Sequence, residues 1–176
     1  QAIAAYTQAI GKKESFDARF GRALAKGLSG DSRGAKEDFG ALPIVPASTV
    51  HTAYLRAIDT IDARTEALAN AVRDAIALAA ALPRSASAIE SAENALAAAE
   101  GLSAIADGSP VPGQFAASHA RRKLAHKLLV QSAQECVLFA RNADDENSGE
   151  STISLGEALK QLAQARDEFR QESTGR

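Results

Sequence analysis

Apolar residues recur in steps of three and four along most of the chain, the spacing that places side chains on one face of an α-helix. The longest such run begins at Ser48 and meets no helix breaker before Pro83. Its apolar face is a heptad-like seam made of Tyr54, Ile58, Ile61, Thr65, Leu68, Val72, Ala75, Ala79 and Leu82. We predict one long amphipathic helix that ends before Pro83, because the residue preceding a proline disfavours helical dihedrals.

Three further helices are expected downstream of this run. Ser87, followed three residues later by Glu90, has the spacing of a capping box, in which both side chains satisfy free N–H groups at the start of a helix. This helix is predicted to end at Gly108, and the next is predicted to cover about 111–142.

The acidic segment 143–150 reads ADDENSGE, and its polar composition predicts a flexible loop. Ser154 and Glu157 repeat the capping-box spacing and indicate the start of the last helix. The four amphipathic helices of 47–176, joined by short connections, predict an antiparallel bundle.

Before the bundle, residues 22–39 read RALAKGLSGDSRGAKEDF. This segment is either a glycine loop that cradles phosphate or the turn of a helical hairpin. The spacing of Gly27, Gly30 and Gly34 fits neither the Walker loop nor the dinucleotide-binding fingerprint, and no strand is predicted before them. The sequence therefore favours the hairpin.

The hairpin interpretation explains several residues together. Gly30 can adopt the positive φ that ends a helix, and Asp31 or Ser32 can cap the next helix by accepting a hydrogen bond from a backbone N–H. Ala35 and Phe39 are four residues apart and share one helical face, which can pack on the preceding helix.

This hairpin resembles a tetratricopeptide repeat, whose helix pair has a small residue in the first helix, a Gly-Asp-type turn, and an alanine four residues before an aromatic residue. Ala23, Gly30-Asp31, Ala35 and Phe39 stand at those positions. Tyr6 lies 33 residues before Phe39, one short of the family's period of about 34, and belongs to a similar small-aromatic-small pattern. The first helix departs from the family by lacking a central bulky aromatic residue and by containing Gly27, which weakens it.

The resemblance covers residues 1–46, and we place the boundary with the bundle near Pro46. A helical hairpin unrelated to the family remains the alternative. The family often binds extended peptides in a concave groove lined by first helices. By register, the groove would contain Asp17, Phe20, Gly21, Leu24 and Leu28. We expect Phe20, Leu24 and Leu28 to contact a partner, and no clamp for a C-terminal carboxylate, because the Lys, Asn and Arg residues of such a clamp are missing.

A second candidate surface is the basic segment 119–127, HARRKLAHK. His119, Arg122 and His126 continue one apolar helical face, and Arg121 points about 100° away from Arg122. Either the end of this helix overhangs the bundle, or an acidic partner docks on these four residues. Binding of nucleic acid is not expected, since no aromatic residues are interleaved with the basic ones.

Composition supports the all-α class, because alanine is the commonest residue and the best helix former. A formal net charge of −2 and a pI near 6.0 give no electrostatic argument for nucleic acid. No apolar run approaches the roughly 20 residues that span a bilayer, so no membrane insertion is expected. A soluble protein is predicted, and a cytoplasmic location is favoured over a periplasmic or secreted one.

Candidates for catalysis or metal binding are weak. The single cysteine, Cys136, lies in an apolar helical context typical of a buried structural residue. Asp59, Asp62 and Glu66 share a helical face that is more typical of a solvated surface than of a cation site. No Glu-x-x-His pair suggests a di-metal bundle, so neither a cofactor nor a metal is expected.

We therefore expect a non-enzymatic helical scaffold or adaptor that holds another protein or peptide, with its oligomeric state left open. The first alternative is a regulatory or sensory helical domain of a larger signalling protein. A helical enzyme with a site between helices is a third interpretation, which a deep polar pocket would favour.

Overall fold

The computed structural model describes residues 1–175, which are almost entirely helical, and this confirms the expected all-α class. The helices in this range are α1 (Ala2–Lys12), α2 (Phe16–Leu28), α3 (Ser32–Gly40), α4 (Ala47–Ala81), α5 (Ala86–Gly108), the 3-10 helix η1 (Gly113–Phe115), α6 (Ala116–Asn142) and α7 (Asp145–Thr174).

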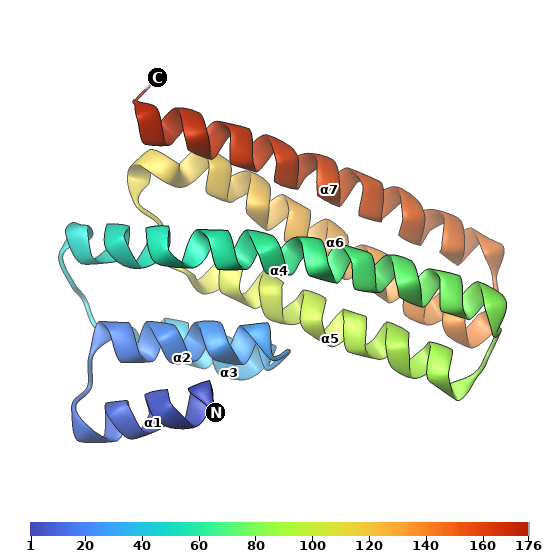
Figure 1. Ribbon diagram of the computed structural model, residues 1–176, viewed down its shortest axis with the longest axis horizontal. Coiled ribbons are helices and arrows are strands. Elements are labelled where there is room, and N and C mark those ends of the chain that lie inside the picture. Colours follow the sequence, from blue (N-terminus) through green and yellow to red (C-terminus); the bar gives the residue numbers. More distant parts are fainter. Residues whose placement is uncertain (176) are drawn as a thin grey trace.

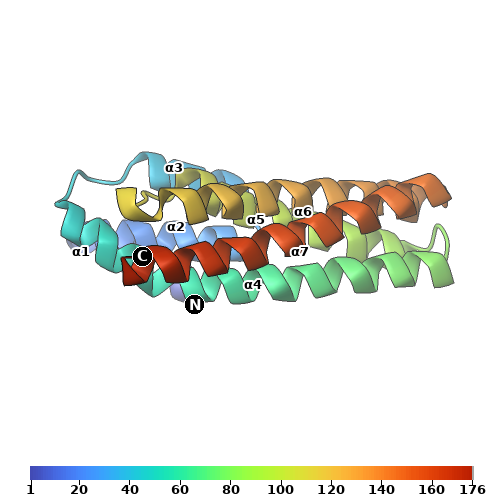
Figure 2. The ribbon, with the colours of Figure 1, turned by 90° about the horizontal axis from the view of Figure 1, so that it is seen from above.

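The helices form an elongated stack (Figure 1), in which the order is α1, then α2 with α3, then α5, α6 and α7. The two chain ends lie at opposite ends of this stack. The long helix α4 lies against one side of it (Figure 2) and contacts α5, α6 and α7. Each helix from α4 to α7 runs antiparallel to its neighbour in the chain.

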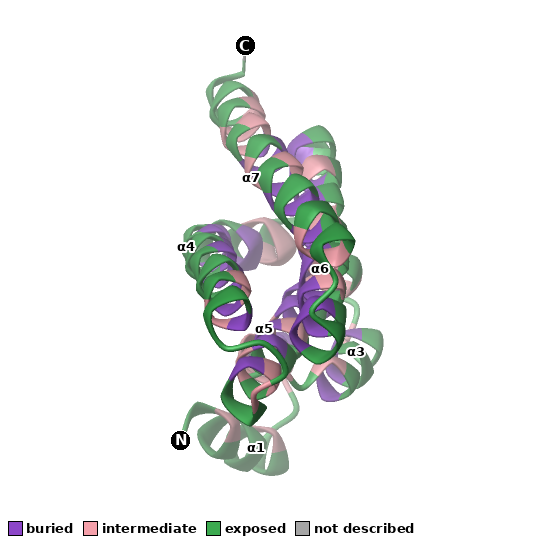
Figure 3. Cartoon of the chain, turned by 90° about the vertical axis from the view of Figure 1, so that its right-hand side faces the viewer, coloured by how far each residue is buried: buried purple, intermediate pink, exposed green. Residues whose placement is uncertain are grey.

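One hydrophobic core crosses the expected boundary at Pro46. Phe20 and Phe39 belong to the same buried cluster as Ile61 of α4, and both α2 and α3 pack on α5. Figure 3 shows the buried residues of α4, α5 and α6 on the sides that face one another. The two segments therefore share packing, and independent folding of residues 47–176 stays a prediction.

Helix α4 buries the predicted seam. Every seam position from Tyr54 to Ala79 is buried, and full burial of a large apolar side chain contributes roughly 1.5–3 kcal/mol. Leu82 is 50% exposed, so the prediction is wrong at that residue. The reason is that α4 ends at Ala81, and helical periodicity no longer applies beyond its end.

The predicted hairpin turn is present. Gly30 has φ of +85°, the left-handed conformation that ends α2. The Asp31 side chain accepts a hydrogen bond from the backbone N–H of Gly34 at 2.8 Å and caps α3. Ala35 is fully buried and Phe39 is 6% exposed, as expected for a shared packing face.

Gly27 and Gly101 allow α2 and α5 to approach closely. A Cβ atom on Gly101 would lie 2.0 Å from the carbonyl oxygen of Gly27, and a Cβ atom on Gly27 would lie 2.5 Å from the Ile105 side chain. Glycine costs about 1 kcal/mol in an isolated helix, but a larger residue at either position would force the two helices apart.

The starts of α5 and α6 differ from the prediction. Ser85, not Ser87, caps α5, and its Oγ accepts a hydrogen bond from the N–H of Ala88 at 3.1 Å. The α-helix predicted over 111–142 begins at Ala116, after the 3-10 helix η1. Prolines at 110 and 112 explain this delay, because each disfavours helical dihedrals in the residue before it.

The largest correction concerns 143–150, of which only Ala143 and Asp144 lie outside a helix. Asp144 caps α7 by accepting a hydrogen bond from the N–H of Glu146 at 3.1 Å. Asp145 and Glu146 lie in the first turn, where negative charge interacts favourably with the helix dipole. The acidic run therefore begins α7, and Ser154, the predicted cap, is buried inside that helix.

Candidate functional site

A groove of 540 Å³ lies between α4 and the pair formed by α1 and α2. All five residues that the repeat register placed in a groove line it, namely Asp17, Phe20, Gly21, Leu24 and Leu28. The opposite wall belongs to α4 and consists of Ala53, Arg56, Ala57, Thr60 and Ile61. Tyr6 and Ala9 of α1, together with Ser15 and Ala18, complete the lining.

The floor of the groove is buried and apolar. The Phe20 ring is 5% exposed, stacks on Phe16 with ring centroids 5.5 Å apart, and meets the edge of Phe39 at 5.8 Å. Leu24 and Leu28 are only half-buried. Phe20 therefore shapes the floor, while the two leucines offer apolar surface that a partner can cover.

A second hollow of 330 Å³ adjoins the first at Leu28 and lies between α4 and α5. Arg64, Leu68 and Ala71 of α4 line it. The wall that α4 contributes to the two hollows extends from Ala53 to Ala71, which is about 27 Å at 1.5 Å per residue.

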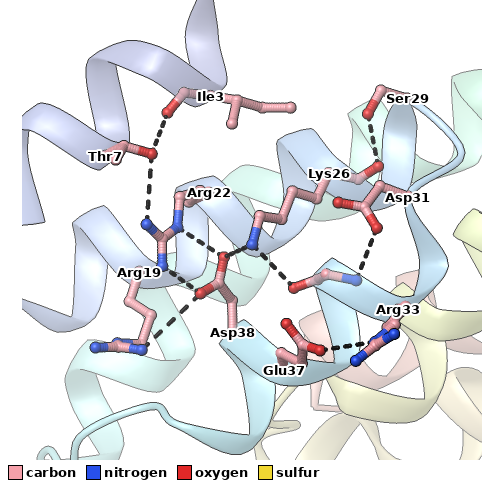
Figure 4. A network of polar contacts seen from close by, with 11 residues as sticks. Ile3, Thr7, Arg19, Arg22, Lys26, Ser29, Asp31, Arg33, Glu37 and Asp38 are labelled. Carbon is pink, nitrogen blue, oxygen red and sulfur yellow. Dashed lines mark hydrogen bonds and ion pairs between the residues drawn. The ribbon is translucent and has the colours of Figure 1, made fainter.

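An ion cluster behind the groove fixes α2 on α3 (Figure 4). Asp38 is 3% exposed, and its carboxylate accepts hydrogen bonds from Arg22 at 2.7 and 2.5 Å. Lys26 approaches the same carboxylate at 3.0 Å, and Arg19 lies at 3.9 Å. Burial alone would raise the pKa of Asp38, but the hydrogen bonds from Arg22 and Lys26 outweigh it and lower the pKa.

The basic segment of α6 is not the surface that the sequence predicted. His119, Arg122 and His126 are 8%, 2% and 1% exposed, so neither an overhanging helix end nor a docking rim describes them. They lie in the interior, where they contact Tyr54, Asp62 and Thr65 of α4 and Ala106 of α5. Only Arg121 is partly exposed, and it bonds Glu168 of α7 at 2.5 Å.

The charge on Arg122 is compensated inside the protein. Its Nε and Nη2 atoms donate to the two carboxylate oxygens of Asp62 on α4 at 2.8 and 2.9 Å. The guanidinium lies over the Phe169 ring, 5.2 Å from its centroid. Arg166 of α7 adds a second contact to Asp62 at 3.3 Å, so this pair connects three helices.

The two histidines beside this pair are neutral. The Thr65 hydroxyl donates to the Ile61 carbonyl, so His126 Nε2 must donate to Thr65 at 2.9 Å. His119 Nε2 donates to the Ala106 carbonyl at 2.8 Å, which leaves its Nδ1 to accept from Tyr54 at 3.3 Å. Burial lowers the pKa of His126 to about 4 and also lowers that of His119.

This interior has little room for a substrate. The hollow beside His119, Arg122 and His126 has a volume of 10 Å³, about the size of one water molecule. Cys136 is fully buried, as predicted, and burial raises the pKa of its thiol to about 11. Residues 1–175 contain no group of three His, Cys, Asp or Glu side chains placed to hold a metal ion.

Within the described range, no helix combines the length and apolar character needed to cross a membrane. The chain matches no protein-family model, no curated protein and no solved structure. The geometry of the chain itself must therefore carry any functional proposal.

Sequence reasoning missed the α4 side of the groove. Arg56, Thr60 and Arg64 recur every four residues beside the buried seam, and this regular polar edge was the available signal. The pairing of Asp62 with Arg122 was also missed. Each is a charged residue on or beside an apolar helical face, which signals a buried charge that needs a partner but does not name that partner.

Proposed function

We propose that this protein is a non-enzymatic helical scaffold that binds a segment of another protein in the groove between α2 and α4. The observation that supports the proposal is the groove itself, a hollow of 540 Å³ with the half-buried Leu24 and Leu28 along one wall. This volume falls in the range of about 300–1,000 Å³ that is usual for binding pockets.

The position of the groove gives further support. The floor residue Phe20 is held by two aromatic contacts, and α2 is fixed from behind by the Asp38 cluster. A pre-formed surface binds without the entropic cost of ordering its own side chains. We also propose that α1, α2 and α3 are tetratricopeptide-like, with the groove on the face that α2 turns toward α4.

The experiment is a selection of random 16-residue peptides displayed on phage against the whole chain. Peptides that bind the groove should lose binding to Leu24→Arg, because a charged side chain would then project into the apolar hollow. The matched control is Leu124→Arg on α6, where a leucine that is 45% exposed lies outside the groove. Circular dichroism of both variants checks that they remain folded.

Enriched peptides that bind wild type and Leu124→Arg, but not Leu24→Arg, would support the proposal. Enriched peptides that bind all three proteins equally would show that the groove is not the binding surface. The same conclusion would follow if no peptide were enriched.

A further inference from the structure

The charges on α4 are segregated by side. Asp59, Asp62 and Glu66 line a hollow of 370 Å³ that α4 shares with α7. Arg56 borders the groove, and Arg64 borders the hollow that adjoins it. At 100° per residue, the two arginines and the three acidic residues occupy different sectors of the helix.

Two of the three acidic residues on this side of α4, Asp62 and Glu66, are paired within the protein, whereas within residues 1–175 Asp59 and the two arginines form no ion pair. Asp62 pairs with Arg122 and Arg166, and Arg166 also pairs with Glu66. Arg56 and Arg64 are exposed, and within residues 1–175 neither forms an ion pair or a side-chain hydrogen bond. The groove therefore has an apolar floor with Arg56 on its α4 rim, and Arg64 stands on the α4 rim of the adjoining hollow.

The length of the α4 wall can be matched to an extended occupant. An extended chain rises about 3.3 Å per residue and alternates its side chains between two faces. About eight extended residues would match the wall from Ala53 to Ala71.

The two arginines also define a spacing. Arg56 and Arg64 are eight residues apart on α4, about 12 Å along the axis. Side chains four residues apart in an extended segment lie on the same face about 13 Å from each other. One face of such a segment can therefore present two carboxylates to the arginines, while the other face places apolar side chains in the hollows.

We propose that the partner is an extended protein segment with alternating apolar side chains and two acidic residues four positions apart, which pair with Arg56 and Arg64. This inference rests on the proposed function, and it names the chemistry of the partner. Asp17 on the α2 side of the groove repels acidic residues from that wall, so it orients the carboxylates toward α4.

The test uses the peptides enriched in the selection described above. We expect acidic pairs at a spacing of four with apolar residues between them. The double variant Arg56→Glu with Arg64→Glu should bind a synthetic copy about tenfold more weakly, since two favourable rim contacts become repulsive. Arg73→Glu with Arg64 and Arg56 intact is the control, because Arg73 lies on the same helix outside both hollows.

A charge exchange makes the test direct. The same peptide with both acidic residues replaced by lysine should bind the double variant better than it binds wild type. The affinity of the acidic peptide for wild type should fall as the salt concentration rises from 0.05 to 0.5 M. Its affinity for the double variant should not fall over the same range.

Three outcomes would overturn the inference. The first is a set of peptides that need Leu24 but show no acidic preference and bind the double variant as well as wild type. This result would support binding in the groove but contradict an acidic partner. Acidic residues spaced seven or eight apart on a helical apolar pattern would remove the extended form. Peptides insensitive to Leu24→Arg would remove the proposed function itself.

Discussion

Removing the carboxylate of Asp62 should destabilise the protein more than removing its buried partner Arg122. In Asp62→Leu, the guanidinium of Arg122, which is 2% exposed, loses both of its hydrogen bonds at 2.8 and 2.9 Å. Its Nη1 already has no hydrogen-bond partner within residues 1–175. An uncompensated buried charge costs about 3–5 kcal/mol, which corresponds to a decrease in Tm of roughly 10 °C for a chain of this size.

Arg122→Met should cost less, about 2 kcal/mol, because Asp62 keeps its contact with Arg166 at 3.3 Å. The double variant should recover most of the loss, since a buried ion pair replaced by apolar residues of similar volume is often neutral in stability. Urea unfolding followed by circular dichroism gives all four corners of the cycle. Additive losses in the double variant would contradict the reasoning, because residues in a coupled pair do not add.

Other substitutions test the remaining features. Asp38→Asn should lower the free energy of unfolding at pH 7 by about 2 kcal/mol. Because the pKa of Asp38 is lowered from its ordinary value of 3.8, wild type should lose this advantage over the variant as the pH falls below about 4. Urea unfolding of both proteins at several pH values measures the difference. Burial lowers the pKa of His126 to about 4. Between pH 6.5 and 4 the unfolded chain therefore binds a proton that the folded protein does not, and the free energy of unfolding of wild type should decrease by roughly 3 kcal/mol. His126→Gln should largely remove this decrease when unfolding is measured as a function of pH. Gly101→Ala should lower the Tm despite its higher helix propensity, at a cost of about 1–3 kcal/mol from overpacking, whereas Gly11→Ala, where a Cβ atom meets nothing within 4 Å, should not.

Features that depend only on residues close together in the sequence were predicted correctly. The seam of α4 follows from spacing alone, and the turn at Gly30 follows from the conformational freedom of glycine. The acidic run before Glu146 was misread, because its polar composition is typical of both a loop and the first turn of a helix. The hydrogen bond to Asp144 distinguishes the two.

Long-range contacts explain the rest of the differences. Asp62 and Arg122 are 60 residues apart, and a single helix pattern cannot show which distant charge neutralises a basic residue on an apolar face. Gly27 weakens an isolated helix, and its packing against Gly101 emerges only when α2 and α5 are brought together. The groove was predicted on its α2 side by the repeat register, but its α4 wall depended on the placement of a helix outside the repeat.

Mapping the amide shifts of the whole chain by nuclear magnetic resonance during titration with an enriched peptide tests the binding surface most directly. The account predicts that the largest changes occur around Leu24 and Leu28 of α2 and around Arg56, Ala57 and Arg64 of α4, with little change on the outer face of α6. Changes concentrated on α6 and α7, with the residues around the groove unaffected, would contradict it.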